Sequence, residues 1–160
     1  MLAQNQHSTQ IVEFIAGDAL HIGDDEHHIP LKFSMVVLLY QGQVVLINNQ
    51  KRKQWELPGG GIEPGEQPHE AAIRELYEEA GQQVETVRYV ARLKFAFAPD
   101  RRLEFGALYT ATTDTLLDFT PNEEVSEIML WDMQTPYPEP DGKISRFILT
   151  HAYKHNLLNT

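Results

Sequence analysis

The 160-residue chain has no cysteine, which excludes disulfide bonds and thiolate metal sites. It also has no long apolar run, because the longest, from Met35 to Tyr40, is far too short to span a bilayer. Residues 1–20 contain no basic segment followed by an apolar core, so they do not resemble a signal peptide. We therefore expect a cytoplasmic protein that does not bind membranes.

Positive charge is scarce. The chain has 13 Lys and Arg residues against 23 Asp and Glu residues, a formal net charge of −10. Proteins that bind nucleic acid generically carry a basic face, so this class is disfavoured. An acidic protein can still bind a phosphate-bearing substrate if metal cations lie between the two.

The length and the lack of repeats predict one domain over residues 1–160, in which the polar residues 1–9 are frayed and flexible. Runs rich in β-branched and aromatic residues predict strands at 10–15, 33–40, 43–47, 84–97, 101–110 and 127–132. Gln41-Gly42 predicts a hairpin turn between the second and third of these.

Two helices complete the pattern. Pro68 suits the first turn of one helix and Gly81 suits its C-terminal cap, which predicts a helix over 68–80. Asp141 is a candidate N-cap for a final helix, whose apolar face would carry Ile144, Phe147, Ile148 and Ala152. Many strands with two helices predict an α+β sandwich.

Three carboxylates share one face of the 68–80 helix. Glu75, Glu78 and Glu79 have i, i+3, i+4 spacing, opposite the apolar face that contains Leu76. Such a run usually means a solvated acidic face. However, like charges four residues apart and negative charge in the last turn both destabilise a helix. A divalent cation would reverse both effects, so a metal site and a solvated face both remain open.

The residues around this helix follow a longer pattern. Gly60 is followed by five residues, Glu66, seven more residues, and then Arg74-Glu75-Leu76-Tyr77-Glu78-Glu79-Ala80-Gly81. This spacing resembles the signature of the Nudix hydrolases, the Nudix box, over residues 60–82. The last box position is normally aliphatic, and here it is Gln82. The preceding segment 55–60 is also similar to the family.

The resemblance implies the Nudix fold, a mixed β-sheet sandwiched between helices (α/β/α). It implies a Mg²⁺-dependent pyrophosphohydrolase, for which Mn²⁺ can substitute, acting on a nucleoside diphosphate linked to another moiety. Dimers are common in the family, so a homodimer is left open. The alternative is a non-catalytic nucleotide-binding regulatory module on the same fold, although such proteins usually lose box carboxylates that this chain retains.

The resemblance also assigns roles within the box. The implied metal ligands are Glu75, Glu78 and Glu79 with a backbone carbonyl at Gly59 or Gly60. Glu78 and Glu79 match the central catalytic pair of the family. Arg74 resembles the residue that orients a catalytic glutamate through a salt bridge. Glu66 resembles the first box glutamate, which supports the loop, and it is also a candidate for substrate binding.

Further candidates lie outside the box, in an acidic segment and among the aromatic residues. The acidic segment 122–127 resembles a loop that supplies a further ligand or the general base in many family members. Glu124 is the preferred residue, Glu123 and Glu127 are the next candidates, and a solvated turn is the alternative. Trp55 could stack on a base, but packing on the sheet is favoured. Phe95, Phe97 and Phe105 alternate on the expected strands, where core packing is favoured, and Phe97 is the candidate for lining a nucleobase pocket.

The box leaves the substrate open. We rank nucleoside triphosphates first, oxidised ones included, and ADP-ribose or another nucleoside diphosphate sugar second. A dinucleoside polyphosphate or a capped RNA end remains an option.

Overall fold

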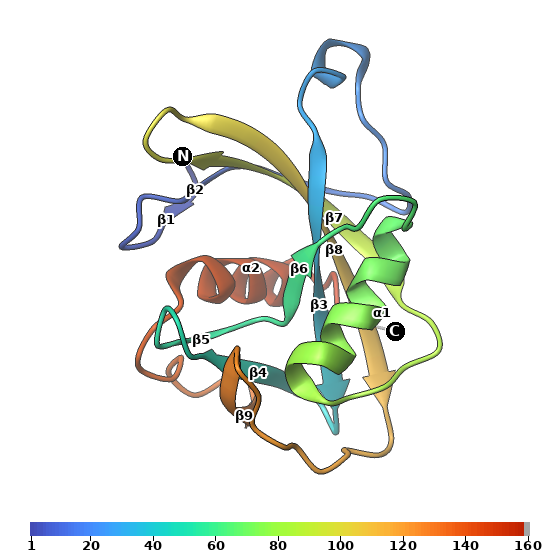
Figure 1. The fold of residues 1–160 in the computed structure, drawn as a ribbon, viewed down its shortest axis with the longest axis vertical. Coiled ribbons are helices and arrows are strands. Elements are labelled where there is room, and N and C mark those ends of the chain that lie inside the picture. Colours follow the sequence, from blue (N-terminus) through green and yellow to red (C-terminus); the bar gives the residue numbers. More distant parts are fainter. Residues whose placement is uncertain (159–160) are drawn as a thin grey trace.

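A computed structural model describes residues 1–158 and, over this range, contains nine strands in one sheet and two α-helices (Figure 1). The strands are β1 (Ala3–Gln4), β2 (Gln10–Ala16), β3 (Leu31–Tyr40), β4 (Gln43–Asn49), β5 (Gln54–Glu56), β6 (Gly59–Gly61), β7 (Arg88–Phe97), β8 (Arg102–Thr113) and β9 (Val125–Trp131). The helices are α1 (Pro68–Ala80) and α2 (Lys143–Lys154), with a short 3-10 helix at Asp24–Glu26. In the described range no helix is long and apolar enough to cross a membrane.

The sheet is mixed. Its strand order is β1-β2-β7-β8-β3-β4-β5, with β6 paired to β3 and β9 paired to β4. The central β3 and β8 are parallel, from Leu31 opposite Phe105 to Tyr40 opposite Thr113, and the other strand pairs are antiparallel. Long strands in the middle and short ones at the edges give the sheet a well-covered centre.

The hairpin predicted at Gln41-Gly42 forms, but it opens after two residue pairs. β3 and β4 pair only at Leu39–Val44 and Tyr40–Gln43. Beyond these pairs β6 lies beside β3, while β5 and β9 flank β4. The two strands therefore diverge, and the space between them becomes available for a cleft.

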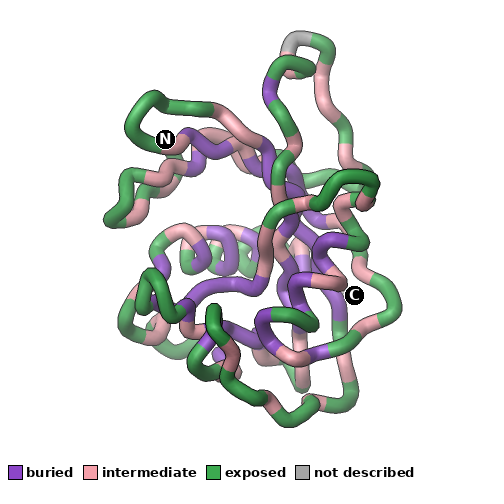
Figure 2. The backbone as a smooth tube through the Cα atoms, in the orientation of Figure 1, coloured by how far each residue is buried: buried purple, intermediate pink, exposed green. Residues whose placement is uncertain are grey.

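Alternation along the strands gives the sheet two apolar faces. Val36 and Leu38 of β3 pack with α1 through Leu76, whereas Val37 packs on the opposite face, where α2 contributes Ile148. Buried residues concentrate along the sheet and on the helix sides that face it (Figure 2). The sheet between two helices is the α/β/α arrangement that the sequence predicted.

Helix α1 begins and ends where the sequence predicted. The Glu70 carboxylate accepts a hydrogen bond from the Gln67 N–H at 2.8 Å, and Gly81 ends the helix at a φ of 69°. The unusual Gln82 is buried, and its amide donates to the Leu117 carbonyl at 2.9 Å and accepts from the Leu117 N–H at 2.8 Å. A fully bonded amide thus replaces the expected aliphatic side chain and holds the helix exit in place.

Two expectations about the fold were wrong. Residues 1–9 are not a frayed tail, because Ala3–Gln4 pairs with β2 and the Asn5 side chain accepts the Thr9 N–H at 2.9 Å. Asp141 does not cap α2, which starts at Lys143 after Gly142. A side chain on Gly142 would collide with the Trp55 carbonyl, and this close approach fixes the helix start there.

Candidate active site

Two glycines let the box loop approach α1 and β3 closely. A Cβ atom on Gly60 would lie 2.4 Å from Oε1 of Glu75, and one on Gly59 would lie 2.5 Å from the Ser34 carbonyl oxygen. A methyl group at Gly59 would meet the β3 backbone, whereas one at Gly60 would displace the carboxylate of Glu75. Pairing of β6 with β3 therefore requires glycine here, and it brings the loop backbone against the carboxylate face of the helix.

Two of the three box carboxylates are buried. Glu75 is 9% exposed and Glu79 is 6% exposed, whereas Glu78 is exposed. Oε1 of Glu79 accepts a hydrogen bond from the Gly59 N–H at 2.8 Å. Burial raises the pKa of Glu79 to about 8 against this hydrogen bond, with smaller contributions from the charges of Glu75 and Glu124. Burial also raises the pKa of Glu75, while Arg74 opposes it.

Arg74 connects the helix to the loop before it. Its guanidinium donates to Glu66 at 2.8 Å, Glu75 at 2.9 Å, Glu78 at 3.1 Å and the Gly61 carbonyl at 2.8 Å. The planar guanidinium can hold several acceptors in a fixed arrangement. Arg74 therefore fixes two of the candidate metal ligands, as expected for an orienting residue.

Both carboxylate oxygens of Glu66 accept hydrogen bonds within this network. Its carboxylate accepts from Arg74 and from the Glu63 N–H at 3.0 Å, and these bonds lower the pKa of Glu66 to about 2. It does not line the cleft described below. These bonds are those of a residue that holds the loop, and a substrate-binding role for Glu66 stays a prediction.

The donor atoms fit a hard divalent cation, although they are not preassembled around one point. Among residues 1–158, no three His, Asp or Glu side chains converge as a ready metal site. Arg74 and the Gly59 N–H satisfy the carboxylates instead. Two buried carboxylates with raised pKa values next to a glycine backbone supply only oxygen ligands, which Mg²⁺ prefers. The ligand roles of Glu75, Glu78, Glu79, Gly59 and Gly60 stay predictions.

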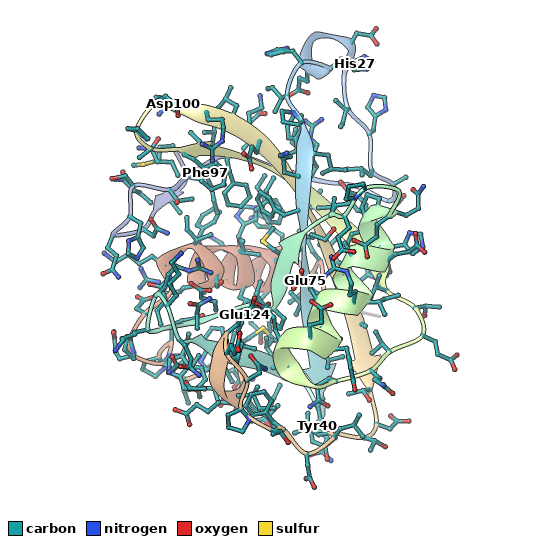
Figure 3. The ribbon with its side chains drawn as sticks, in the orientation of Figure 1. His27, Tyr40, Glu75, Phe97, Asp100 and Glu124 are labelled. Atoms are coloured by element: carbon teal, nitrogen blue, oxygen red, sulfur yellow. The ribbon has the colours of Figure 1, made fainter. Side chains whose placement is uncertain are left out.

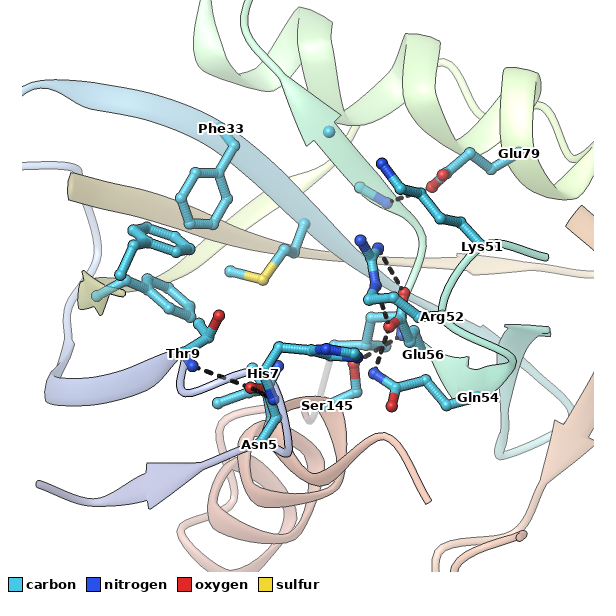
Figure 4. A pocket seen from close by; sticks show the side chains of 17 residues that line it. Asn5, His7, Thr9, Phe33, Lys51, Arg52, Gln54, Glu56, Glu79 and Ser145 are labelled. Atoms are coloured by element: carbon cyan, nitrogen blue, oxygen red, sulfur yellow. Dashed lines mark hydrogen bonds and ion pairs between the residues drawn. The ribbon is translucent and has the colours of Figure 1, made fainter. Parts of the chain in front are cut away.

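A cleft of about 640 Å³ is lined by residues of β3, β5, β6, β7 and the two helices, and by the turns that precede β2 and β5. Glu79 lies at one end with Lys51 and Arg52 (Figure 4), and the Gly59 N–H is bonded to Glu79 there. Gly60 also lines the cleft. The remaining lining includes aromatic and N-terminal residues: Phe33, Met35, Phe95, Phe97, Asn5, His7 and Thr9. Phe33 lies at the other end of the cleft from Glu79 in Figure 4. The cleft therefore has a charged end and an aromatic end.

Of the aromatic candidates, some line the cleft and others are buried in the core. The rings of Phe95 and Phe97 are stacked with centroids 5.9 Å apart, and Phe33 meets Phe97 edge-on at 6.3 Å. Phe97 therefore lines the cleft as expected, whereas Phe105 is buried beneath the guanidinium of Arg92. Trp55 is buried in the core on the α2 side and does not line the cleft. Packing, which the sequence favoured for Trp55, is what the structure shows, because alternation along β5 turns Gln54 and Glu56 toward the cleft instead.

The acidic loop reaches the end of α1. The Nδ2 amide of Asn122 donates to the Glu78 carbonyl at 3.3 Å, and Asn122 Oδ1 accepts the Glu124 N–H at 2.9 Å. The charge of Glu124 contributes to the raised pKa values of Glu75 and Glu79. Glu124 and Glu75 are labelled in Figure 3. Glu124 is thus placed to act with the box residues, and its role stays a prediction.

Comparison with known proteins settles the family. Residues 30–149 match the family model described as the NUDIX domain. The chain belongs to the Nudix family. A crystal structure of a Bacillus subtilis pyrophosphohydrolase variant shares the Nudix fold with a TM-score of 0.71 and 20% identity, over 96% of this chain and 94% of that chain.

Curated relatives match over shorter stretches. An RNA pyrophosphohydrolase of Photorhabdus laumondii is 41% identical over 68 residues, which cover 42% of this chain and 38% of the relative. Another, from Bartonella clarridgeiae, is 35% identical over 105 residues, covering 62% of this chain and 56% of the relative. The Nudix chain thus spans less than two thirds of the length of these relatives.

Glutamine substitutions at the acidic loop test its role. We expect Glu124→Gln to lower kcat about 100-fold or more, because positioned proton transfer contributes at least this much. Glu123→Gln is the matched control, since Glu123 is an exposed neighbour in the same loop and should keep the wild-type rate. Steady-state kinetics of these variants and of Glu127→Gln would measure the effect. If all three keep wild-type rates, the loop is only a solvated turn.

Several residues that line the cleft were not predicted from the sequence. Lys51 and Arg52 follow β4 in a polar turn, and sequence alone does not distinguish them from solvated turn residues. Phe33 looks like an ordinary strand residue. Glu56 is buried and accepts a hydrogen bond from Arg52 at 2.7 Å. The two residues are four apart in the sequence, a spacing that predicts a contact in a helix but not in the turn and strand where they lie. Their shared position becomes visible only when β3 and β4 diverge.

Proposed function

We propose that this chain is a metal-dependent Nudix pyrophosphohydrolase that adds water across a phosphoanhydride bond of a nucleotide. One observation carries the proposal: the buried carboxylates Glu75 and Glu79 lie against the Gly59–Gly60 backbone, with Glu79 at the charged end of a cleft whose other end is aromatic. Such a cleft suits a ligand with a polyanionic part and a flat, apolar part.

The reaction needs the negative charge of the phosphates neutralised before water can attack. Mg²⁺, or Mn²⁺ in its place, would be held by the box carboxylates and a glycine carbonyl, and would neutralise phosphate oxygens and acidify a water molecule. The water oxygen bonds to phosphorus while the bridging P–O bond breaks, and the departing phosphate takes the electron pair.

The side chains divide the remaining work. Arg74 keeps Glu75 and Glu78 in place, and the Gly59 N–H holds one oxygen of Glu79 so that the other stays available. Glu124 accepts the proton of the attacking water. Phe33 and Phe97 bind the base at the aromatic end, where stacking is favourable for any base.

For the substrate we propose a nucleotide with a 5′-polyphosphate, either a free nucleoside triphosphate or the phosphorylated 5′ end of an RNA. The curated relatives are named RNA pyrophosphohydrolases, which favours the RNA end. The net charge of −10 disfavours binding along an RNA backbone, so recognition would be confined to the terminal nucleotide. Nucleoside diphosphate sugars rank second.

A substrate panel tests this proposal. The purified protein is assayed with Mg²⁺ on nucleoside triphosphates, an oxidised triphosphate, a 5′-triphosphorylated oligoribonucleotide, ADP-ribose and a dinucleoside polyphosphate. We expect the highest kcat/KM on a 5′-triphosphate, with pyrophosphate or phosphate as a product identified by ³¹P NMR. Nucleotide binding without hydrolysis of any member would contradict the enzyme and favour a regulatory module.

A further inference from the structure

The turn between β4 and β5 holds two cations over the charged end of the cleft. Oδ1 of Asn49 accepts the backbone N–H groups of Lys51 at 2.9 Å and Arg52 at 2.8 Å. Gln50 ties the same turn to the acidic loop, since its N–H donates to the Glu124 carbonyl at 2.8 Å and its side chain donates to the Asn122 carbonyl at 2.8 Å. The turn is therefore held in a fixed position beside the candidate catalytic residues.

The two cations differ in their pairing. Arg52 makes two hydrogen bonds to the buried Glu56, at 2.7 and 2.9 Å, so its charge is already compensated. Among the side chains that the structure describes, Lys51 has no ion-pair partner and its ammonium group makes no hydrogen bond. Its side chain nevertheless lines the cleft and reaches toward Glu79 (Figure 4). Lys51 is thus a free ammonium group directed into the site.

The position of Lys51 suggests which part of the substrate it meets. A base bound at the aromatic end near Phe33 would direct its phosphate chain toward Glu79. The scissile anhydride would lie on the carboxylate face of α1, and Lys51 would lie near the outer end of the chain. An ammonium group binds phosphate well as a compact point charge. A neutral sugar at this place would gain little from it.

We propose that Lys51 binds the terminal phosphate of a substrate with three or more consecutive phosphates, and that it makes the site prefer 5′-triphosphates over nucleoside diphosphate sugars. This inference rests on the proposed function and specifies its substrate class. Arg52 does not compete for the same phosphate, because its guanidinium is paired with Glu56.

Two matched substitutions test the proposal. Lys51→Gln removes the free ammonium group, and Lys53→Gln removes the same charge from an exposed lysine of the same turn that does not line the cleft. We expect Lys51→Gln to lower kcat/KM for a nucleoside triphosphate roughly 10- to 100-fold, the usual effect of losing a charge-assisted hydrogen bond. Its kcat/KM for ADP-ribose should stay within about twofold. Lys53→Gln should leave both values unchanged.

Binding of inorganic ligands tests the role of Lys51 independently of whether the protein is a hydrolase. Calorimetric titrations with tripolyphosphate and pyrophosphate, in the presence of Mg²⁺, need no turnover. We expect Lys51→Gln to weaken tripolyphosphate binding while pyrophosphate binding stays close to wild type. Equal loss for both ligands, or no loss for either, would overturn the proposal, whether or not the wild-type protein hydrolyses nucleotides.

Discussion

Replacing Glu79 with glutamine should lower kcat/KM about 1000-fold or more while leaving the metal-free protein as stable as wild type or more stable. The activity should fall because the substitution removes a charged ligand or base whose contribution to the transition state is several kcal/mol. The fold should hold because glutamine has nearly the same shape and its Oε1 can still accept the Gly59 N–H.

The gain in stability should depend on pH. Burial raises the pKa of Glu79 to about 8, so the folded protein disfavours the charged form. No penalty exists below pH 4.5, where the carboxyl is protonated in both the folded and the unfolded chain. The penalty grows as the pH rises toward 8. The free energy of unfolding, measured with urea in the absence of metal, should therefore favour Glu79→Gln over wild type more strongly at pH 8.5 than at pH 4.

Glu85→Gln is a suitable control, because Glu85 is exposed and lies outside the cleft. It should change neither activity nor the pH dependence of stability. Opposite movement of activity and stability is the sign of a carboxylate kept for function. A Glu79→Gln protein with wild-type kcat/KM, or one that fails to fold, would contradict the role assigned to Glu79.

Local patterns in the sequence account for α1 and its box. The boundaries of α1 at Pro68 and Ala80 follow from residues that act on their immediate neighbours, a proline in the first turn and a glycine cap. The carboxylate face follows from helical spacing alone. What spacing did not reveal is that Glu75 and Glu79 are buried while Glu78 is exposed, since this depends on the loop that folds over the helix.

Features that depend on distant segments were harder to predict. A hairpin turn indicates that β3 and β4 begin side by side, but not that β6 and β9 separate them further along. β6 consists of three glycines and has no side-chain pattern by which a strand could be recognised. The cleft joins residues such as Phe33, Lys51 and Phe97, which share no sequence motif and meet only through this divergence.

The carboxylate face of α1 should require a divalent cation for all turnover. Glu75, Glu78 and Glu79 place three acidic groups on one helix face, and the chain carries a net charge of −10. Without a cation, this face would repel a polyphosphate. Mg²⁺ would relieve the repulsion between the carboxylates, so it should also raise the melting temperature of the wild-type protein more than that of Glu79→Gln.

The most direct test is to measure hydrolysis of the best 5′-triphosphate substrate before and after exhaustive chelation, and again after adding back metal. The account predicts that turnover falls to the uncatalysed rate in excess chelator and returns with Mg²⁺, and also with Mn²⁺. Substrate and enzyme concentrations are held constant, and the chelator is shown by circular dichroism to leave the fold intact. Full turnover in excess chelator would contradict a catalytic site that acts through metal held by α1.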